Sequence, residues 1–351
     1  MAFLSIPNVA ITGISACVPK HEEFCSEFPL FSEDESLNFS KTTGVISRRV
    51  SSPEICSSDL CYHAADKLLS DLQWNREEID CLVFVAQTPD YHLPATSPLL
   101  QKRLGLSDNC LALDISLGCS GYVYGLSVIS SMLSHGNIKK GLLLAGDTIS
   151  KTCSKNDKTT HPLFGDAGSA TALEFELGGR RLLFNLKTDG SGSDVIKIED
   201  GGFRHPVNLD SFKEMKIDEG ISRNKLQLVL EGMDVFTFGI SKAPANIKEL
   251  AEHFKLNLEN IDYFIFHQAN KFMNEKIRKK LNIPSEKVPY SIERFGNTSC
   301  ATIPLTMVTE MRDKLQNNRL FHIACGFGVG LSWGSVYFET NKIVVPELLE
   351  I

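Results

Sequence analysis

The second half of this chain repeats the first, and this repeat constrains the fold more than any single element does. A predicted helix from Ser57 to Trp74 leads into the apolar run IDCLVFVAQT, Ile79 to Thr88. A second predicted helix, Ile240 to Phe254, leads into IDYFIFHQAN, Ile261 to Asn270. Each run is followed by a helix with a similar ending, KRLGL in one case and KKLNI in the other. The matched order predicts a duplicated α/β unit.

The two apolar runs are nearly continuous, which is typical of strands covered on both faces. Between the halves the chain turns polar and glycine-rich, as expected of a linker or a cover over a site. We therefore expect an N-terminal half over residues 1–184, a connecting segment over 185–225, and a C-terminal half over 226–351.

Composition narrows the class of protein. With 351 residues, 42% hydrophobic and 23% charged, the chain has the balance of a globular protein, and its net charge of -7 argues against general nucleic-acid binding. The N-terminus lacks a basic segment followed by an apolar core, and no uncharged run reaches bilayer length, so we expect a cytoplasmic protein that does not enter a membrane. The ten cysteines form no CxxC pair, so no metal site is predicted.

One cysteine stands in a distinctive setting. In LALDISLGCSGYVYGLSVISSML, Leu111 to Leu133, a predicted strand breaks at Gly118 and a helix follows, so Cys119 lies at a helix start. The helix dipole there favours a thiolate, and the flanking glycines allow a substrate to approach. Inert packing is the alternative, because buried cysteines are common.

Two polar residues at predicted strand ends complete a candidate site. His267 follows the second-half strand, and Asn297 lies in FGNTSCATIP before another helix. Alone, the histidine could be structural and the asparagine a helix cap. Together with Cys119 they suggest a thiolate-imidazolium nucleophile, and N–H donors for an oxygen that becomes negative. The turn GFGVGLSWG, Gly326 to Gly334, could supply a backbone N–H that forms an oxyanion hole with that of Cys119.

These motifs resemble those of the β-ketoacyl-[acyl-carrier-protein] synthase III family in the thiolase-like superfamily. The resemblance rests on GCSGY, HQAN, GNTS and GFGVGLSWG, supported by TPDYHLPAT and FGDAGSATAL, and spans nearly the whole chain. It implies an α/β thiolase-like fold, with duplicated halves in a five-layered α-β-α-β-α sandwich, and a homodimer. It also implies no tightly bound cofactor, because the substrates are phosphopantetheine thioesters.

The resemblance further implies a mechanism. Cys119 would take an acyl group from a thioester, and malonyl-[acyl-carrier-protein] would lose carbon dioxide, its developing enolate held by His267 and Asn297. A Claisen condensation would then free Cys119. By motif position, the second oxyanion-hole N–H belongs to Val329, where the family usually has glycine. Phe164 is expected to shape the acyl pocket.

The resemblance has informative departures. Where the family's coenzyme A segment carries a Trp and an Arg before its TGI motif, this chain has Asn38 and Thr42, and the Arg two residues after HQAN is Phe272. We therefore predict an acyl donor that is a carrier-protein thioester or an unusual coenzyme A ester. The helix after HQAN matches the family's docking helix for the acidic acyl carrier protein, although a solvated face is the alternative. Its basic residues are Lys271, Lys276, Arg278, Lys279 and Lys280.

Other functions fit parts of this pattern. Relatives with the same triad make polyketides or alkylquinolones, or transfer an acyl group without decarboxylation. These functions are kept as alternatives. A papain-like protease shares the order Cys, His, Asn, but the duplicated βα pattern does not suit it. A non-catalytic partner subunit would have no need for all three residues. The sequence does not disclose the acyl chain.

Overall fold

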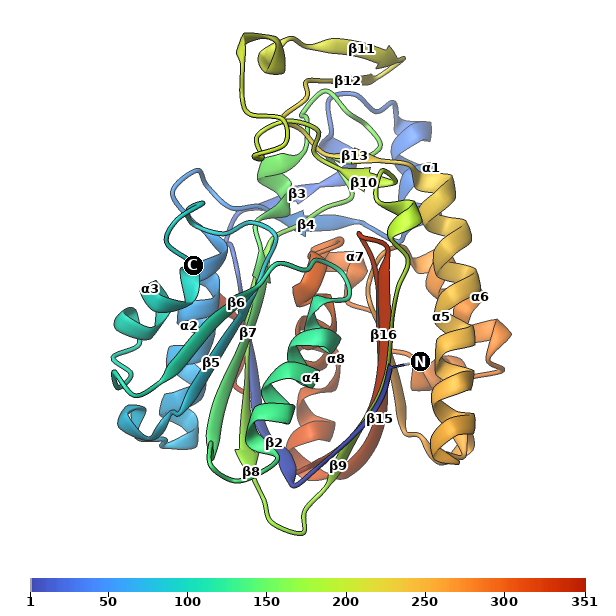
Figure 1. Ribbon diagram of the computed structural model, residues 1–351. Helices are drawn as coiled ribbons and strands as arrows, with labels where there is room; N and C mark the ends of the chain where they lie inside the picture. The colour runs from blue at the N-terminus through green and yellow to red at the C-terminus, as the bar shows by residue number, and fades with distance from the viewer. Residues whose placement is uncertain (1) are drawn as a thin grey trace.

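Two sheets organise the fold in the computed structural model, which describes residues 2–351 (Figure 1). The first sheet contains β2 (Val9–Val18), β5 (Cys81–Val85), β6 (Leu111–Ile115), β7 (Lys140–Asp147), β8 (Ala167–Phe175) and β17 (Leu349–Glu350). The second contains β1 (Ala2–Pro7), β9 (Arg181–Thr188), β14 (Tyr263–Phe266), β15 (Arg319–Gly328) and β16 (Ser332–Asn341). The strand orders are β17-β2-β8-β7-β5-β6 and β1-β9-β16-β15-β14.

The predicted duplication is visible in the pairing of the strands. In the first sheet β5 is parallel to β7, β7 is antiparallel to β8, and β8 is antiparallel to β2. In the second sheet β14, β15, β16 and β9 repeat the same order and the same directions. Each sheet therefore contains the same four-stranded core, and the corresponding strands β5 and β14 are those of the two matched apolar runs.

Helices cover both sheets and fill the space between them (Figure 1). The outer face of the first sheet carries α2 (Ser57–Leu72) and α3 (Thr96–Arg103), and that of the second carries α5 (Gly232–Phe254) and α6 (Lys271–Lys280). Between the sheets lie α4 (Gly121–Leu133) and α8 (Thr302–Asn317), in one apolar cluster with Phe184, Leu126 and Met307. The result is the five-layered sandwich expected from the sequence.

A cap of short elements covers the end of the sandwich where the two central helices begin. It consists of α1 (Glu33–Thr43), α7 (Ile292–Phe295), the paired strands β3 (Glu22–Phe24) and β4 (Ser47–Arg49), the paired strands β10 (Ile196–Lys197) and β13 (Val229–Leu230), and the hairpin β11 (Met215–Asp218) with β12 (Ile221–Arg223). The hairpin projects at the top of the molecule in Figure 1. Most of the polar connecting segment thus lies in this cap.

Several boundaries differ from the sequence-based expectation. β9 runs across the division expected between residues 184 and 185, because its apolar residues pair with β1 and β16. α5 begins at Gly232 instead of Ile240, and the strand β1 was not predicted. Because β1 and β9 join the C-terminal strands while β17 joins the N-terminal sheet, the sheets do not follow the chain's division. The three-part division stays a prediction.

Candidate active site

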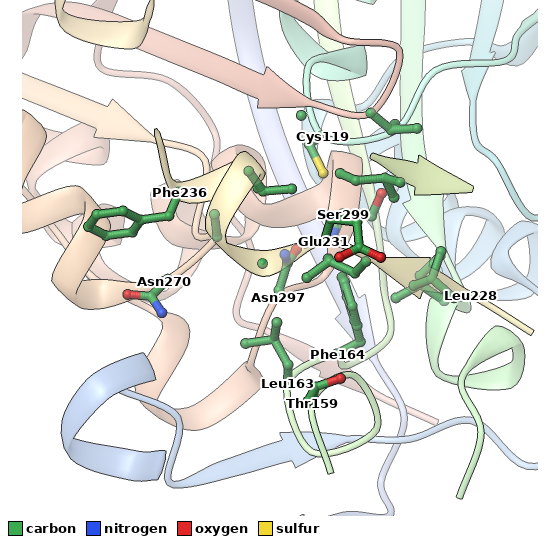
Figure 2. A pocket seen from close by; sticks show the side chains of 18 of the residues that line it. Cys119, Thr159, Leu163, Phe164, Leu228, Glu231, Phe236, Asn270, Asn297 and Ser299 are labelled. Atoms are coloured by element: carbon green, nitrogen blue, oxygen red, sulfur yellow. Dashed lines mark hydrogen bonds between the residues drawn. The ribbon is translucent and has the colours of Figure 1, made fainter. Parts of the chain in front are cut away.

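The three residues singled out in the sequence line one cavity. Its volume is about 570 Å³, and Cys119, His267 and Asn297 lie on its wall. Figure 2 shows Cys119 and Asn297 there. Val329 and Phe164 line it as well. The residues come from both halves of the chain, and Cys119 and Asn297 meet because Cys119 lies two residues before α4 while Asn297 closely precedes α8. The two central helices therefore bring the two halves of the candidate site together.

Cys119 is held in place by close backbone packing. A β-carbon on Gly326 would lie 2.8 Å from the carbonyl oxygen of Cys119, so the glycine turn must lack side chains to reach it. The Cys119 sulfur lies within hydrogen-bonding reach of the backbone N–H groups of Val329 and of Cys119 itself. These are the two groups predicted to form the oxyanion hole.

The environment of the thiol contradicts the predicted thiolate. Burial, the largest contribution, and the nearby Asp147 carboxylate raise the pKa of Cys119, which is about 12. Hydrogen bonds from the two N–H groups and from the Ser299 hydroxyl lower the pKa but do not compensate. Desolvation is the largest of these contributions, because a charged sulfur loses its hydration on burial. At neutral pH the resting side chain is a thiol.

His267 lies directly after β14 and is 1% exposed. Its backbone N–H donates to Cys325 O at 2.8 Å, and its Nδ1 lies 2.7 Å from Thr302 Oγ1. Burial lowers the pKa of the imidazole to about 3, so the ring is neutral at neutral pH. The predicted thiolate-imidazolium pair is therefore not the resting state of this site.

Asn297 has an amide group free to donate. Its Oδ1 accepts from the Ser299 N–H at 3.0 Å, which leaves the Nδ2 hydrogens as the part of the side chain available to the cavity. The backbone of Asn297 is bound on both sides, its N–H to Leu163 O at 2.9 Å and its carbonyl to the Gly165 N–H at 3.2 Å. This bridge also positions Phe164, the expected pocket residue.

The rest of the cavity wall is mainly apolar. Phe164 is 4% exposed, and its carbonyl accepts from the buried Arg48 guanidinium at 2.8 Å. Other apolar side chains on the wall are Ile149, Leu163, Ile196, Leu228, Leu230 and Phe327. A wall of this kind binds a long, largely uncharged group, and the few polar side chains orient it.

The basic residues of the predicted docking helix α6 differ in whether their charged groups already have a partner within the protein. Lys271 is paired with Glu293, Arg278 with Glu275, and the Lys280 ammonium donates to Ile240 O at 2.9 Å. Lys276 lies over the Phe272 ring, 4.9 Å from its centroid. Lys279 is exposed and makes no ion pair within residues 2–351. The positive charge free to meet a partner therefore lies mainly on Lys276 and Lys279.

The residues that depart from the family pattern lie around the cavity. Thr42 and Asn38 are on α1, where the Thr42 hydroxyl donates to Asn38 O at 2.8 Å, and the next residue, Thr43, lines the cavity. Phe272 is 47% exposed and stacks on Phe236, with ring centroids 5.8 Å apart.

Within residues 2–351, no helix combines the length and apolar character that a membrane crossing requires.

Sequence reasoning missed two residues behind the nucleophile. Asp147 ends β7 with no exposed surface, and Ser299 lines the cavity together with Cys119. The signal available in the sequence was the position of Asp147 at the end of a buried strand, which is where polar site residues occur in open α/β sheets.

Comparison with solved structures defines the class of fold. The chain matches a 3-oxoacyl-(acyl-carrier protein) synthase from Burkholderia xenovorans with a TM-score of 0.93 and 36% identity, over 100% of this chain and 99% of that chain. A priming β-ketosynthase of the R1128 polyketide pathway shares the fold, with a TM-score of 0.83 and 22% identity over 96% of this chain and 97% of that chain. The fold is thiolase-like.

Sequence comparison then gives the family. Models described as 3-oxoacyl-[acyl-carrier-protein] synthase III and as the C-terminal part of that enzyme match residues 113–190 and 251–340. A putative 3-oxoacyl-[acyl-carrier-protein] synthase 3 of Campylobacter jejuni is 32% identical, over 97% of this chain and 96% of its own length. A β-ketoacyl-[acyl-carrier-protein] synthase III of Prochlorococcus marinus is 34% identical, over 84% of this chain and 85% of its own length. The chain belongs to the 3-oxoacyl-[acyl-carrier-protein] synthase III family.

Proposed function

We propose that this protein catalyses a decarboxylating Claisen condensation between an acyl thioester and malonyl-[acyl-carrier-protein], through an acyl group carried on Cys119. The observation that carries the proposal is the meeting of Cys119, His267 and Asn297 in one largely apolar cavity. Family membership supports the same reaction class. The enzyme is an acyltransferase in this proposal, with no tightly bound cofactor.

In the first step, the Cys119 sulfur attacks the carbonyl carbon of the acyl thioester. The oxygen of the tetrahedral intermediate accepts from the N–H groups of Cys119 and Val329. The carbon–sulfur bond to the phosphopantetheine thiol then breaks, and that thiol leaves with a proton. The acyl group stays on Cys119 as a thioester. Only backbone atoms form the oxyanion hole, so a valine can stand where glycine is usual.

In the second step, malonyl-[acyl-carrier-protein] occupies the vacated cavity and its carbon–carboxylate bond breaks. The electron pair enters the thioester as an enolate, whose oxygen accepts from the Asn297 amide and an N–H of His267. The enolate carbon attacks the acyl carbon, and the Cys119 sulfur leaves and regains a proton. A neutral His267 suits this role, because a donor to a developing enolate need not itself be charged.

We propose that the acyl donor is preferentially a carrier-protein thioester. Asn38, Thr42 and Phe272 leave the cavity without the aromatic and basic groups that the family uses for coenzyme A. A cluster of positive charge on α6, in a chain of net charge -7, suits an acidic carrier protein. Phosphopantetheine is common to both donors, so only their relative rates discriminate between them.

We further propose a cytoplasmic homodimer. All ten cysteines are free thiols, which suits a reducing compartment. Within residues 2–351, β6 pairs only with β5, and its first residue, Leu111, is 43% exposed, so this edge strand offers an apolar surface to a second copy. We also propose that the connecting segment, residues 185–225, covers the cavity in each copy. The N-terminal half, residues 1–184, and the C-terminal half, residues 226–351, flank this segment in the chain.

Intact-protein mass spectrometry tests the function. The protein is incubated with matched acyl-carrier-protein and acyl-coenzyme A thioesters, and carbon dioxide release is measured after malonyl-[acyl-carrier-protein] is added. We expect one acyl group on the wild type, none on Cys119→Ala, and faster acylation by the carrier thioester. An adduct that persists on Cys119→Ala would exclude Cys119 as the nucleophile. Acyl transfer without carbon dioxide release would favour a non-decarboxylating acyltransferase.

A further inference from the structure

A buried arginine outside the cavity wall holds the segment that carries Phe164. Arg48 lies on β4 and is 2% exposed. Its Nη1 donates to Phe164 O at 2.8 Å and also to the carbonyl oxygen of His161. Its Nη2 donates to Glu23 and lies 2.8 Å from His161 Nε2, which must accept because a guanidinium has only donors. Both terminal nitrogens of the guanidinium therefore have partners.

The segment held by Arg48 lies against the backbone of Asn297. The Asn297 N–H donates to Leu163 O at 2.9 Å, and the Asn297 carbonyl accepts from the Gly165 N–H at 3.2 Å. Within residues 2–351 this pairing is an isolated bridge, so no longer ladder of hydrogen bonds supports its register. Leu163, Phe164 and Asn297 all line the cavity (Figure 2). Phe164, whose carbonyl Arg48 binds, thus stands between the two residues that hold Asn297.

The stem of Arg48 contacts the other side of the same bridge. Gly296 immediately precedes Asn297, and a β-carbon on it would lie 3.5 Å from Arg48 Cβ, an ordinary contact distance. The same β-carbon would lie 2.6 Å from Leu163 O, so the two segments of the bridge are packed backbone to backbone. Arg48 therefore touches both segments, one through its guanidinium and one through its stem.

Loss of the guanidinium would leave the Phe164 carbonyl without a donor. Phe164 is 4% exposed, and its carbonyl has no other hydrogen-bond donor within residues 2–351. A buried carbonyl without a partner is unfavourable, so this peptide would turn toward another donor. Because Asn297 is bonded to both neighbours of Phe164, the movement would reach the Asn297 amide. A displacement of about 1 Å at a group that acts on a reacting atom slows a reaction by up to about 100-fold.

We propose that Arg48 is a positioning residue for the decarboxylation step and holds the Asn297 amide where the enolate oxygen develops. The inference rests on the proposed function. Arg48 is absent from the cavity wall and acts only through the Phe164 carbonyl and the bridge to Asn297. Cys119 and His267 are positioned by other elements, before α4 and after β14. Acylation of Cys119 should therefore depend on Arg48 much less than decarboxylation does.

A double-mutant cycle tests this proposal. Carbon dioxide release from malonyl-[acyl-carrier-protein] is measured in wild type, Arg48→Met, Asn297→Asp and the double variant, each after acylation. Methionine keeps an apolar stem but donates no hydrogen bond. We expect release to slow about tenfold in Arg48→Met, because the amide is displaced. The same substitution should slow Asn297→Asp by less than about twofold, because the amide that Arg48 positions is already missing there.

Arg49→Met is the matched control, because it changes the next residue of the same strand. Arg49 donates to Pro19 O at 3.2 Å and to Lys20 O at 3.1 Å, and it pairs with Glu350 at 3.0 Å. Its side chain is therefore engaged away from the bridge, and we expect carbon dioxide release at the wild-type rate. Intact mass follows acylation, which should fall by a much smaller factor than decarboxylation in Arg48→Met.

Equal slowing by Arg48→Met in both backgrounds would indicate general damage and overturn the proposal, as would the absence of slowing in the wild-type background. If Arg48→Met does not fold, Arg48→Lys decides, because it keeps the charge but replaces two donor nitrogens by one. Its release should be slowed in the wild-type background only, and release at the wild-type rate overturns the proposal. A wild type that releases no carbon dioxide removes the proposed function and this inference together, whereas an active wild type with an unaffected Arg48→Met removes the inference alone.

Discussion

Gly328 lies so close to Cys119 that a β-carbon on it would be 2.6 Å from the Cβ and 2.8 Å from the sulfur of the cysteine. Gly328 ends β15, the strand that enters the glycine turn, and both residues line the cavity. The nucleophile can therefore occupy its position only because this neighbour has no side chain.

This contact predicts that Gly328→Ala disables the nucleophile. The added methyl group must displace the Cys119 side chain or the turn, at an overpacking cost of about 1–3 kcal/mol, so we expect acylation to slow at least about tenfold. Acylation is followed by intact mass. Gly190→Ala is the control, because a β-carbon there meets nothing within 4 Å. Equal acylation of the two variants would mean that the Cys119 position is not critical.

Variants of His267 and Asn297, the two proposed donors to the enolate, should lose malonyl decarboxylation but largely keep acylation of Cys119. His267→Ala, and Asn297→Asp, which keeps the acceptor for the Ser299 N–H but loses the Nδ2 donor, remove hydrogen bonds to the enolate. We expect malonyl decarboxylation to fall roughly 100-fold in each, while acylation of Cys119 changes much less. Carbon dioxide release and intact mass measure the two steps. A matching collapse of acylation in His267→Ala would identify His267 as the acceptor of the thiol proton.

The free positive charges on α6 predict which lysines matter for a carrier protein. Reversal of Lys276 and Lys279 to Glu should raise the Kd for the carrier roughly fivefold, at about 0.5 kcal/mol for each exposed pair, and the effect should shrink in high salt. A small-molecule thioester should react as before. The control is Lys67→Glu on α2, where Lys67 pairs with Asp71. Loss of reactivity with both kinds of thioester would indicate structural damage instead of lost docking.

A buried histidine outside the cavity should make stability depend on pH. His322 has no exposed surface, its Nε2 lies 2.8 Å from Thr340 Oγ1, and burial lowers its pKa to about 3. Below about pH 6.5 His322 binds a proton in the unfolded chain, whereas in the folded protein it binds this proton only near pH 3. The contribution to the free energy of unfolding is thus complete above pH 6.5 and falls by about 1.4 kcal/mol per pH unit as the solution is acidified.

Urea denaturation at pH 7.5 and pH 5 tests this prediction in His322→Asn. The variant should lose about 2 kcal/mol less stability than the wild type between the two conditions, because it lacks the group that takes up the proton. His135→Asn, at an exposed position, is the control and should follow the wild type. The same loss in both variants and the wild type would contradict the prediction.

Local pattern was sufficient for much of the architecture. The apolar runs around β5 and β14 revealed the repeat, and both strands are central to their half of the fold, although β14 covers only Tyr263–Phe266 of the expected run. Cys119, His267 and Asn297 were found at the ends of elements, and all three line one cavity. The placement of β1 and β9 in the second sheet was not predicted, because pairing between strands about 180 residues apart leaves no local signal in the sequence.

The sequence by itself determined the duplicated α/β halves, the family and the residues most suited to chemistry, because burial and backbone requirements leave a periodic record in neighbouring residues. Only the tertiary structure decided the charge states of those residues. Desolvation of Cys119 and His267 arises from groups that meet only in the folded protein. Their pKa values depend on that surrounding space, which no pattern of adjacent residues describes.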